Sequence, residues 1–85
     1  MNEKAKALYV VDDKLNDEGL ALVVGQMRSN SIFERKIMQL YWYNEECLLK
    51  YGQDNAGLSV VEFLRQYGAI LYVVGEFLNI KANSK

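Results

Sequence analysis

Histidine and proline are absent from the chain, and cysteine occurs once, at Cys47. Histidine is the commonest general base and the commonest transition-metal ligand near neutral pH, so its absence argues against the usual acid–base centres and zinc sites. A single cysteine excludes an internal disulfide, and without histidine it cannot belong to a Cys–His nucleophile pair. The carboxylate of Glu46 next in sequence disfavours a reactive thiolate. We therefore predict a protein that is not an enzyme and that binds no metal and no cofactor.

Long hydrophobic runs are also absent. The longest uncharged apolar run covers residues 69–74, far short of the roughly 20 residues that span a bilayer. The apolar stretch near the start of the chain, residues 7–11, is too short for the core of a signal peptide. Because an unpaired cysteine suits a reducing compartment, we predict a cytoplasmic protein without membrane insertion.

Charge of one sign does not dominate, because ten Lys and Arg stand against eleven Asp and Glu. Such a balance gives no strong field for a polyanion. With 85 residues the chain forms one helical domain, residues 1–85, and its 51% hydrophobic content can build a core. A domain this small covers its apolar surface only in part, which leaves self-association open.

One apolar run ends in two aspartates, in the sequence "LYVVDD" at residues 8–13. This segment resembles the first strand and acidic pair of a response-regulator receiver domain, where two acids help to hold a magnesium ion. A receiver also needs a phosphoacceptor aspartate after a later apolar strand, and the chain offers only Asp54, in a polar stretch. The receiver interpretation therefore fails. The acids form a candidate partner-binding patch, with a solvated turn or helix end as the alternative: Asp12, Asp13, Asp17 and Glu18.

Two serines that are followed by glutamate after two intervening residues indicate helix starts. Ser31 with Glu34, and Ser59 with Glu62, match the capping box. In that motif the serine side chain and the glutamate side chain each bond to the backbone N–H of the other residue. We expect one helix to begin just after each serine.

Apolar residues at helical spacing follow both capping boxes. The spacing predicts helices over about 32–51 and 60–80, and Gly52 suits the end of the first. The turn-forming residues of 52–58 predict a loop between them. These two helices are expected to form the antiparallel backbone of the fold.

The first thirty residues allow two interpretations. Leu, Ala, Lys and Glu favour helix, which predicts helices over about 3–14 and 17–28. Alternatively, "ALYVV" and "LALVV" form two short strands joined by a polar turn. The first interpretation gives an all-α bundle of three or four helices. The second gives an α+β fold, with an N-terminal β-hairpin packed on two helices.

Three consecutive aromatic residues lie within the helix predicted over 32–51. Successive helical side chains point about 100° apart, so Tyr41, Trp42 and Tyr43 cannot all face one core. With Tyr41 inside, Trp42 or Tyr43 must lie at a rim or outside. Trp and Tyr dominate the binding energy of many protein interfaces. Trp42 and Tyr43 are therefore candidate partner-binding residues, and burial of both between neighbouring helices is the alternative.

The helix predicted over 60–80 carries mostly small residues at intervals of seven. Glycine inside a helix costs about 0.5–1 kcal/mol relative to alanine, so the two glycines in this line need a structural reason. Close approach of a neighbouring backbone is such a reason, and a two-fold homodimer would supply one. The candidate self-association residues are Val61, Gly68, Tyr72 and Gly75.

These features predict a non-enzymatic protein-binding module, a small regulator, adaptor or inhibitor that acts by occupying the surface of a partner protein. Compact inhibitors encoded by phages or mobile elements fit the same profile. The alternative is a small DNA-binding transcriptional regulator that uses the helix after Ser31, because three cations gather there. Glu34 lies among those cations and argues against nucleic acid. The cations are Arg28, Arg35 and Lys36.

Overall fold

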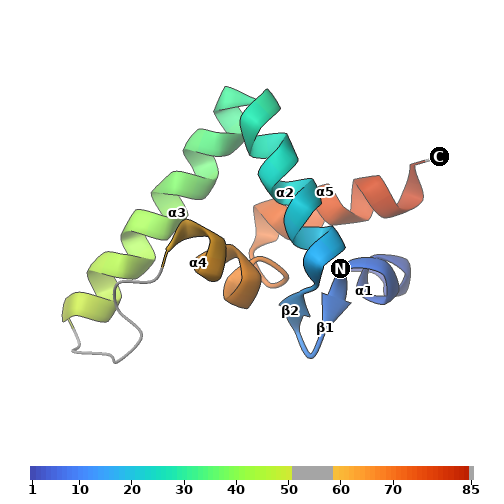
Figure 1. Cartoon of the computed structure of the whole chain (residues 1–85), viewed down its shortest axis with the longest axis horizontal. Helices are drawn as coiled ribbons and strands as arrows, with labels where there is room; N and C mark the ends of the chain where they lie inside the picture. The colour runs from blue at the N-terminus through green and yellow to red at the C-terminus, as the bar shows by residue number, and fades with distance from the viewer. Residues whose placement is uncertain (51–58, 85) are drawn as a thin grey trace.

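The computed structural model describes residues 1–50 and 59–84, and this part of the chain forms five helices and one short antiparallel hairpin (Figure 1). The predicted all-α class is confirmed, with five helices in place of three or four. A short N-terminal hairpin is also present, but it pairs residues 10–11 with 14–15, whereas the second strand of the alternative prediction, residues 20–24, is helical. In chain order the elements are α1 (Glu3–Tyr9), β1 (Val10–Val11), β2 (Lys14–Leu15), α2 (Asp17–Ser29), α3 (Ser31–Lys50), α4 (Val60–Tyr67) and α5 (Tyr72–Asn83).

Helix α1 is shorter than the helix predicted over 3–14. The Asn2 side chain caps its start by accepting a hydrogen bond from the backbone N–H of Ala5 (2.8 Å). The backbone N–H of Asn2 donates to the side-chain oxygen of Asn79 in α5 (2.9 Å). This bond ties the N-terminus to the C-terminal helix, and α1 and α5 pack side by side.

The hairpin replaces the second half of the helix predicted over 3–14. Val10 pairs with Leu15, and the two residues at the turn, Asp12 and Asp13, have positive φ angles of 52° and 64°. A two-residue turn with positive φ at both positions matches the twist of an antiparallel hairpin. Aspartate tolerates this conformation better than most residues because its short side chain can bond locally. The chain therefore turns at the acidic pair.

Helix α2 agrees with the prediction for 17–28. The Asn16 side chain caps it by accepting from the N–H of Gly19 (2.8 Å), while its amide group donates to the carbonyl of Leu8 (2.9 Å). A Cβ atom at Gly19 would lie 2.7 Å from the carbonyl oxygen of Tyr9. Helix α2 can approach the end of α1 this closely because residue 19 has no side chain.

A single residue, Asn30, connects α2 to α3. Its side-chain oxygen accepts hydrogen bonds from the N–H groups of Ile32 and Phe33, both at 3.1 Å. The prediction that Ser31 caps α3 is therefore wrong by one residue, since Ser31 already lies within the helix. The short connection makes α2 and α3 meet at an apex, as the two arms of an inverted V (Figure 1).

The capping prediction for α4 is confirmed at its serine. The Ser59 side chain accepts from the N–H of Glu62 (3.2 Å). Helix α4 then runs back between α3 and the hairpin (Figure 1). Helix α3 is described as far as Lys50. The end predicted at Gly52 and the loop predicted over 52–58 lie outside the described residues.

The prediction of one continuous helix over 60–80 is wrong. Helix α4 ends at Tyr67 and α5 begins at Tyr72, with Leu71 in an extended conformation (φ −72°, ψ 129°). At Gly68, a Cβ atom would lie 2.6 Å from a methyl group of Leu15 in the hairpin. The hairpin thus packs directly on the chain where α4 ends. The apolar spacing continues across this break, so periodicity alone does not reveal it.

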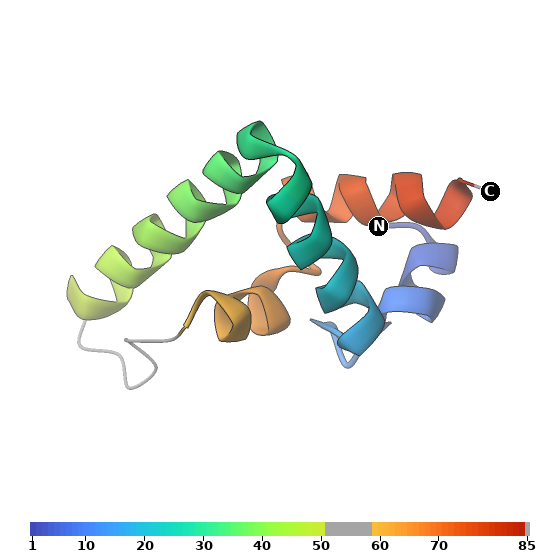
Figure 2. The ribbon, with the colours of Figure 1, turned by 45° about the horizontal axis from the view of Figure 1, so that its top comes forward.

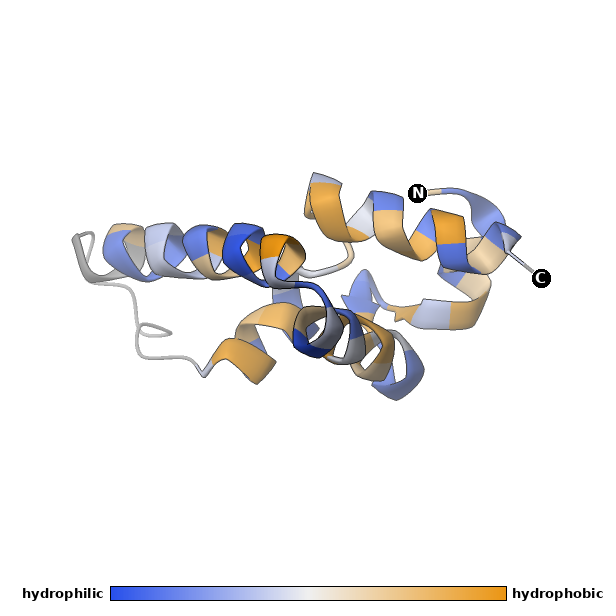
Figure 3. Cartoon of the chain, turned by 90° about the horizontal axis from the view of Figure 1, so that it is seen from above, coloured by the Kyte–Doolittle hydropathy of each residue, from blue (hydrophilic) through white to orange (hydrophobic). Residues whose placement is uncertain are grey.

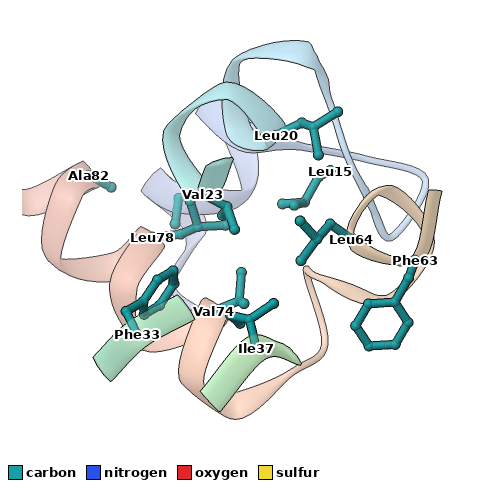
Figure 4. Packing of buried hydrophobic residues seen from close by; sticks show 11 residues of the cluster. Leu15, Leu20, Val23, Phe33, Ile37, Phe63, Leu64, Val74, Leu78 and Ala82 are labelled. Atoms are coloured by element: carbon teal, nitrogen blue, oxygen red, sulfur yellow. The ribbon is translucent and has the colours of Figure 1, made fainter. Parts of the chain in front are cut away.

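The core collects side chains from every helix and from the second strand. In Figure 4, Val23 of α2, Ile37 of α3 and Val74 of α5 point toward one another. Every fully buried side chain among the described residues is apolar. Ring contacts extend this core, between Phe33 and Phe77 and between Tyr41 and Phe63, each with 5.4 Å between centroids. The buried residues are Ala5, Leu15, Leu20, Val23, Phe33, Ile37, Phe63, Leu64, Val74, Leu78 and Ala82.

Within the described residues, no helix combines the length and the apolar character that crossing a membrane requires.

Candidate protein-binding surface

A shallow hollow runs along the side of α3 that faces away from the core. Phe33 and Ile37 mark the inward side of the helix. The residues that line the hollow recur at intervals of three and four, so they share the opposite side. We call this surface the outer face of α3. Its residues are Ser31, Glu34, Arg35, Met38, Gln39, Trp42, Tyr43 and Glu46.

The two predicted aromatic residues both lie on this face. The side chain of Trp42 is 61% exposed and that of Tyr43 is 68% exposed. Tyr41 is the inward member of the run, with its ring edge-on to Phe63. The alternative prediction, that both Trp42 and Tyr43 are buried between neighbouring helices, is therefore wrong. Their exposure is confirmed, and their role in binding stays a prediction.

The outer face of α3 carries an acid and a base near the apex, Glu34 and Arg35, and a second acid, Glu46, towards its other end. Glu46 lies about three turns beyond Arg35, and both are exposed. Between them, a side-chain hydrogen bond to Cys47 raises the pKa of the Tyr43 hydroxyl, and the negative charge of Glu46 raises it further. Tyr43 is therefore neutral at physiological pH. It presents an apolar ring with a polar tip, which suits a contact surface.

The four acids of the predicted patch are exposed but do not join the outer face of α3. Asp12 and Asp13 form the hairpin turn, and Asp17 and Glu18 lie in the first turn of α2, where the helix dipole favours negative charge. The Asp17 carboxylate accepts a hydrogen bond from Arg65 (3.1 Å). Local structure thus explains the position of each acid, and partner binding by this patch stays a prediction.

The predicted self-association residues do not form one line, because they belong to two helices and the segment between them. Val61 and Tyr72 are exposed, whereas Gly68 and Gly75 are buried. The space at Gly68 is filled by Leu15 of the same chain. The expectation of a glycine-lined face on one long helix is wrong, and Gly68 serves internal packing.

The three cations of the DNA-binding alternative lie around the apex between α2 and α3. Arg28 is near the end of α2, Arg35 and Lys36 follow in the second turn of α3, and all three are exposed. Glu34 is exposed beside them. Figure 3 shows hydrophilic and hydrophobic residues interspersed along the side of α3 that faces the viewer.

Sequence reasoning missed most of the outer face, although the signal for it is present. Met38 and Gln39 are not prominent in the sequence, but they lie opposite the apolar stripe that begins with Phe33 and Ile37. Listing the positions opposite the core stripe, in addition to the stripe itself, would have identified them.

The described residues contain no group of three or more His, Cys, Asp and Glu side chains placed to hold a metal ion. Comparisons of the chain with protein-family models, with curated proteins and with solved structures gave no match.

Proposed function

We propose that this protein is a non-enzymatic binding module, a small cytoplasmic regulator, adaptor or inhibitor, and that it receives a partner protein on the outer face of α3. The observation that carries the proposal is the exposure of two adjacent aromatic side chains, Trp42 (61%) and Tyr43 (68%). Large exposed aromatic groups lose contact with water when a partner covers them, and Trp and Tyr are the residues most enriched at binding hot spots.

The anchoring of α3 supports this use of its outer face. Phe33 and Ile37 are buried, and the Tyr41 ring packs against Phe63 of α4. These contacts hold the helix from its inward side and leave the outward side uncovered by described elements. A surface held in place before binding loses less conformational entropy when a partner docks.

A matched pair of substitutions tests the proposal. Trp42→Ala removes an aromatic side chain from the outer face of α3, and Ile80→Ala removes an apolar side chain of similar exposure, 64%, from α5. The full chain and both variants are immobilised and exposed to lysate from the native host, and retained proteins are compared by mass spectrometry.

We expect one protein to be retained by the wild type and by Ile80→Ala and to be lost with Trp42→Ala. The retained protein is then purified and titrated against the three chains, so that direct binding is measured. A partner that binds all three chains equally would contradict the proposal, and so would a lysate from which the wild type retains nothing.

A further inference from the structure

We infer that a second copy of this chain can occupy the outer face of α3, with the two α3 helices antiparallel about a two-fold axis. The inference rests on the proposed function, because it identifies a competing occupant of the same surface. It places the self-association contact on α3, away from the glycines of the α4–α5 segment.

The spacing of the residues at the centre of the outer face is the first observation. Arg35, Gln39, Trp42 and Glu46 follow one another at intervals of four, three and four. This order of intervals is unchanged when it is read backwards. An antiparallel copy therefore places residue 35 opposite residue 46, and residue 39 opposite residue 42, as a two-fold axis requires.

The charges on the stripe are the second observation. The antiparallel arrangement brings the guanidinium of Arg35 to the carboxylate of Glu46 of the second copy, and symmetry repeats this pair at the other end. A parallel arrangement would instead place arginine against arginine and glutamate against glutamate. Opposite charges across an interface fix orientation and register, whereas like charges oppose association. The charge pattern thus selects the antiparallel pair.

The apolar groups at the centre are the third observation. Trp42 would lie against Gln39 of the second copy, whose side-chain oxygen can accept from the indole N–H. Met38 and Tyr43 flank this centre on the outer face. Pairing therefore covers the exposed Trp42 ring and leaves its single polar group with a partner.

The length of the contact sets its strength. Eleven residue steps separate Arg35 from Glu46, which at about 1.5 Å per residue spans about 17 Å. This is short compared with interfaces of about 1,600 Å² that form stable complexes. We expect a dissociation constant on the order of 10 μM or weaker. Such a dimer can yield its surface to a partner protein, so self-association and partner binding exclude each other.

Charge reversal tests the inference in the full chain. Sedimentation equilibrium is measured from low micromolar to near-millimolar concentration for the wild type, Arg35→Glu, Glu46→Arg and the double variant. Each single variant places like charges at both ends of the antiparallel pair, and we expect a dissociation constant raised about tenfold or more, a loss typical for close charge pairs. The double variant exchanges the charges and should restore dimerisation to within about threefold of the wild type.

Lys36→Glu is the matched control, because it makes the same charge change at the residue next to Arg35 but off the stripe. We expect its dissociation constant to stay within about threefold of the wild type. Circular dichroism of every variant confirms that the helices are intact. An equimolar mixture of the two single variants should form a heterodimer, since its opposing charges are again complementary.

A wild type that stays monomeric over the whole range overturns the inference. Single variants that dimerise as the wild type does, or a double variant that is not restored, overturn it as well. These outcomes leave the proposed function intact, because capture of a partner and its loss with Trp42→Ala are measured separately. Conversely, a confirmed dimer without a captured partner contradicts the proposed function and leaves this inference standing.

Discussion

Helices α5 and α3 differ in how much of their surface the rest of the chain covers. Val74, Leu78 and Ala82 are buried at intervals along α5, which packs beside α1. Of residues 31–47 in α3, only Phe33 and Ile37 are buried, and both lie in its first two turns. Beyond them α3 extends away from α2 and α5 (Figure 2), while the Tyr41 ring still packs against Phe63 of α4. The comparison indicates that the compact part of the chain provides most of the stability, and it is consistent with our proposal that α3 provides a contact surface.

The shape of the molecule is consistent with this division. Its principal extents are 43, 29 and 18 Å, so it is long and flat. A flat domain buries less apolar surface than a compact one of the same length, and small domains are already limited in this respect. The apolar residues that the core cannot cover are found in part on α3, as Trp42 and Tyr43.

The largest expected effect comes from truncating the core at α5. Leu78→Ala removes a fully buried side chain, and such changes lower the free energy of unfolding by about 2–5 kcal/mol. Met38→Ala on α3 truncates a half-buried side chain of similar size and should cost less than about 1 kcal/mol. Urea denaturation followed by circular dichroism measures both. Equal losses would remove the distinction between the two helices.

The second effect compares two glycines of α2. A Cβ atom at Gly19 would lie 2.7 Å from the carbonyl oxygen of Tyr9, whereas nothing lies within 4 Å of a Cβ at Gly25. We expect Gly19→Ala to destabilise by about 1–3 kcal/mol through overpacking. Gly25→Ala should stabilise by about 0.5–1 kcal/mol, because alanine favours helix over glycine. Thermal unfolding of the two variants should therefore shift in opposite directions. Shifts of the same sign would show that α2 does not press against α1 as described.

The start of α3 gives a smaller effect and decides between two caps. Asn30 accepts from two backbone N–H groups, at 3.1 Å each, so Asn30→Ala should cost about 1 kcal/mol. Ser31→Ala should change the stability by less than about 0.5 kcal/mol, since Ser31 lies inside the helix. Denaturant titrations separate these values. A larger loss at Ser31 would restore the capping box that the sequence suggested.

The smallest expected effect on stability is that of Trp42→Ala. Its side chain is mostly exposed, and the free energy of unfolding should change by less than about 0.5 kcal/mol. The same variant is expected to lose partner binding. A chevron or equilibrium unfolding curve that shows a loss of several kcal/mol would instead make Trp42 a structural residue of α3.

Local signals in the sequence predicted the helices well where the cap and the apolar spacing agree. The start of α4 at Ser59 follows this rule, whereas α2 was predicted from its helix-favouring composition. The hairpin turn was harder, because "DD" is a weaker signal than Asn-Gly for a turn that needs two positive φ angles. The break at Gly68 depends on Leu15, far away in the sequence, filling the space beside it. No local pattern contains that contact.

Only part of the candidate surface was predicted, because the rest of it also depends on contacts between segments far apart in the sequence. Consecutive aromatic residues on a helix must point in different directions, so exposure of Trp42 or Tyr43 followed from geometry alone. The extent of the outer face of α3 depends on where α2, α4 and α5 do not pack. The extent of the face therefore depends on tertiary packing. In the sequence it is visible only as the positions of α3 that lie opposite the core stripe.

The most direct test follows backbone amide chemical shifts of the isotope-labelled chain in a dilution series, from near-millimolar to low micromolar concentration. The central claim tested is that a second copy of the chain contacts the outer face of α3 while the remaining helices act as scaffold. We predict concentration-dependent shifts concentrated on α3 from Ser31 to Cys47, largest around Gln39 and Trp42, with α1 and α5 unchanged. Shifts centred on α1 or α5, or spectra identical at every concentration, would contradict the account.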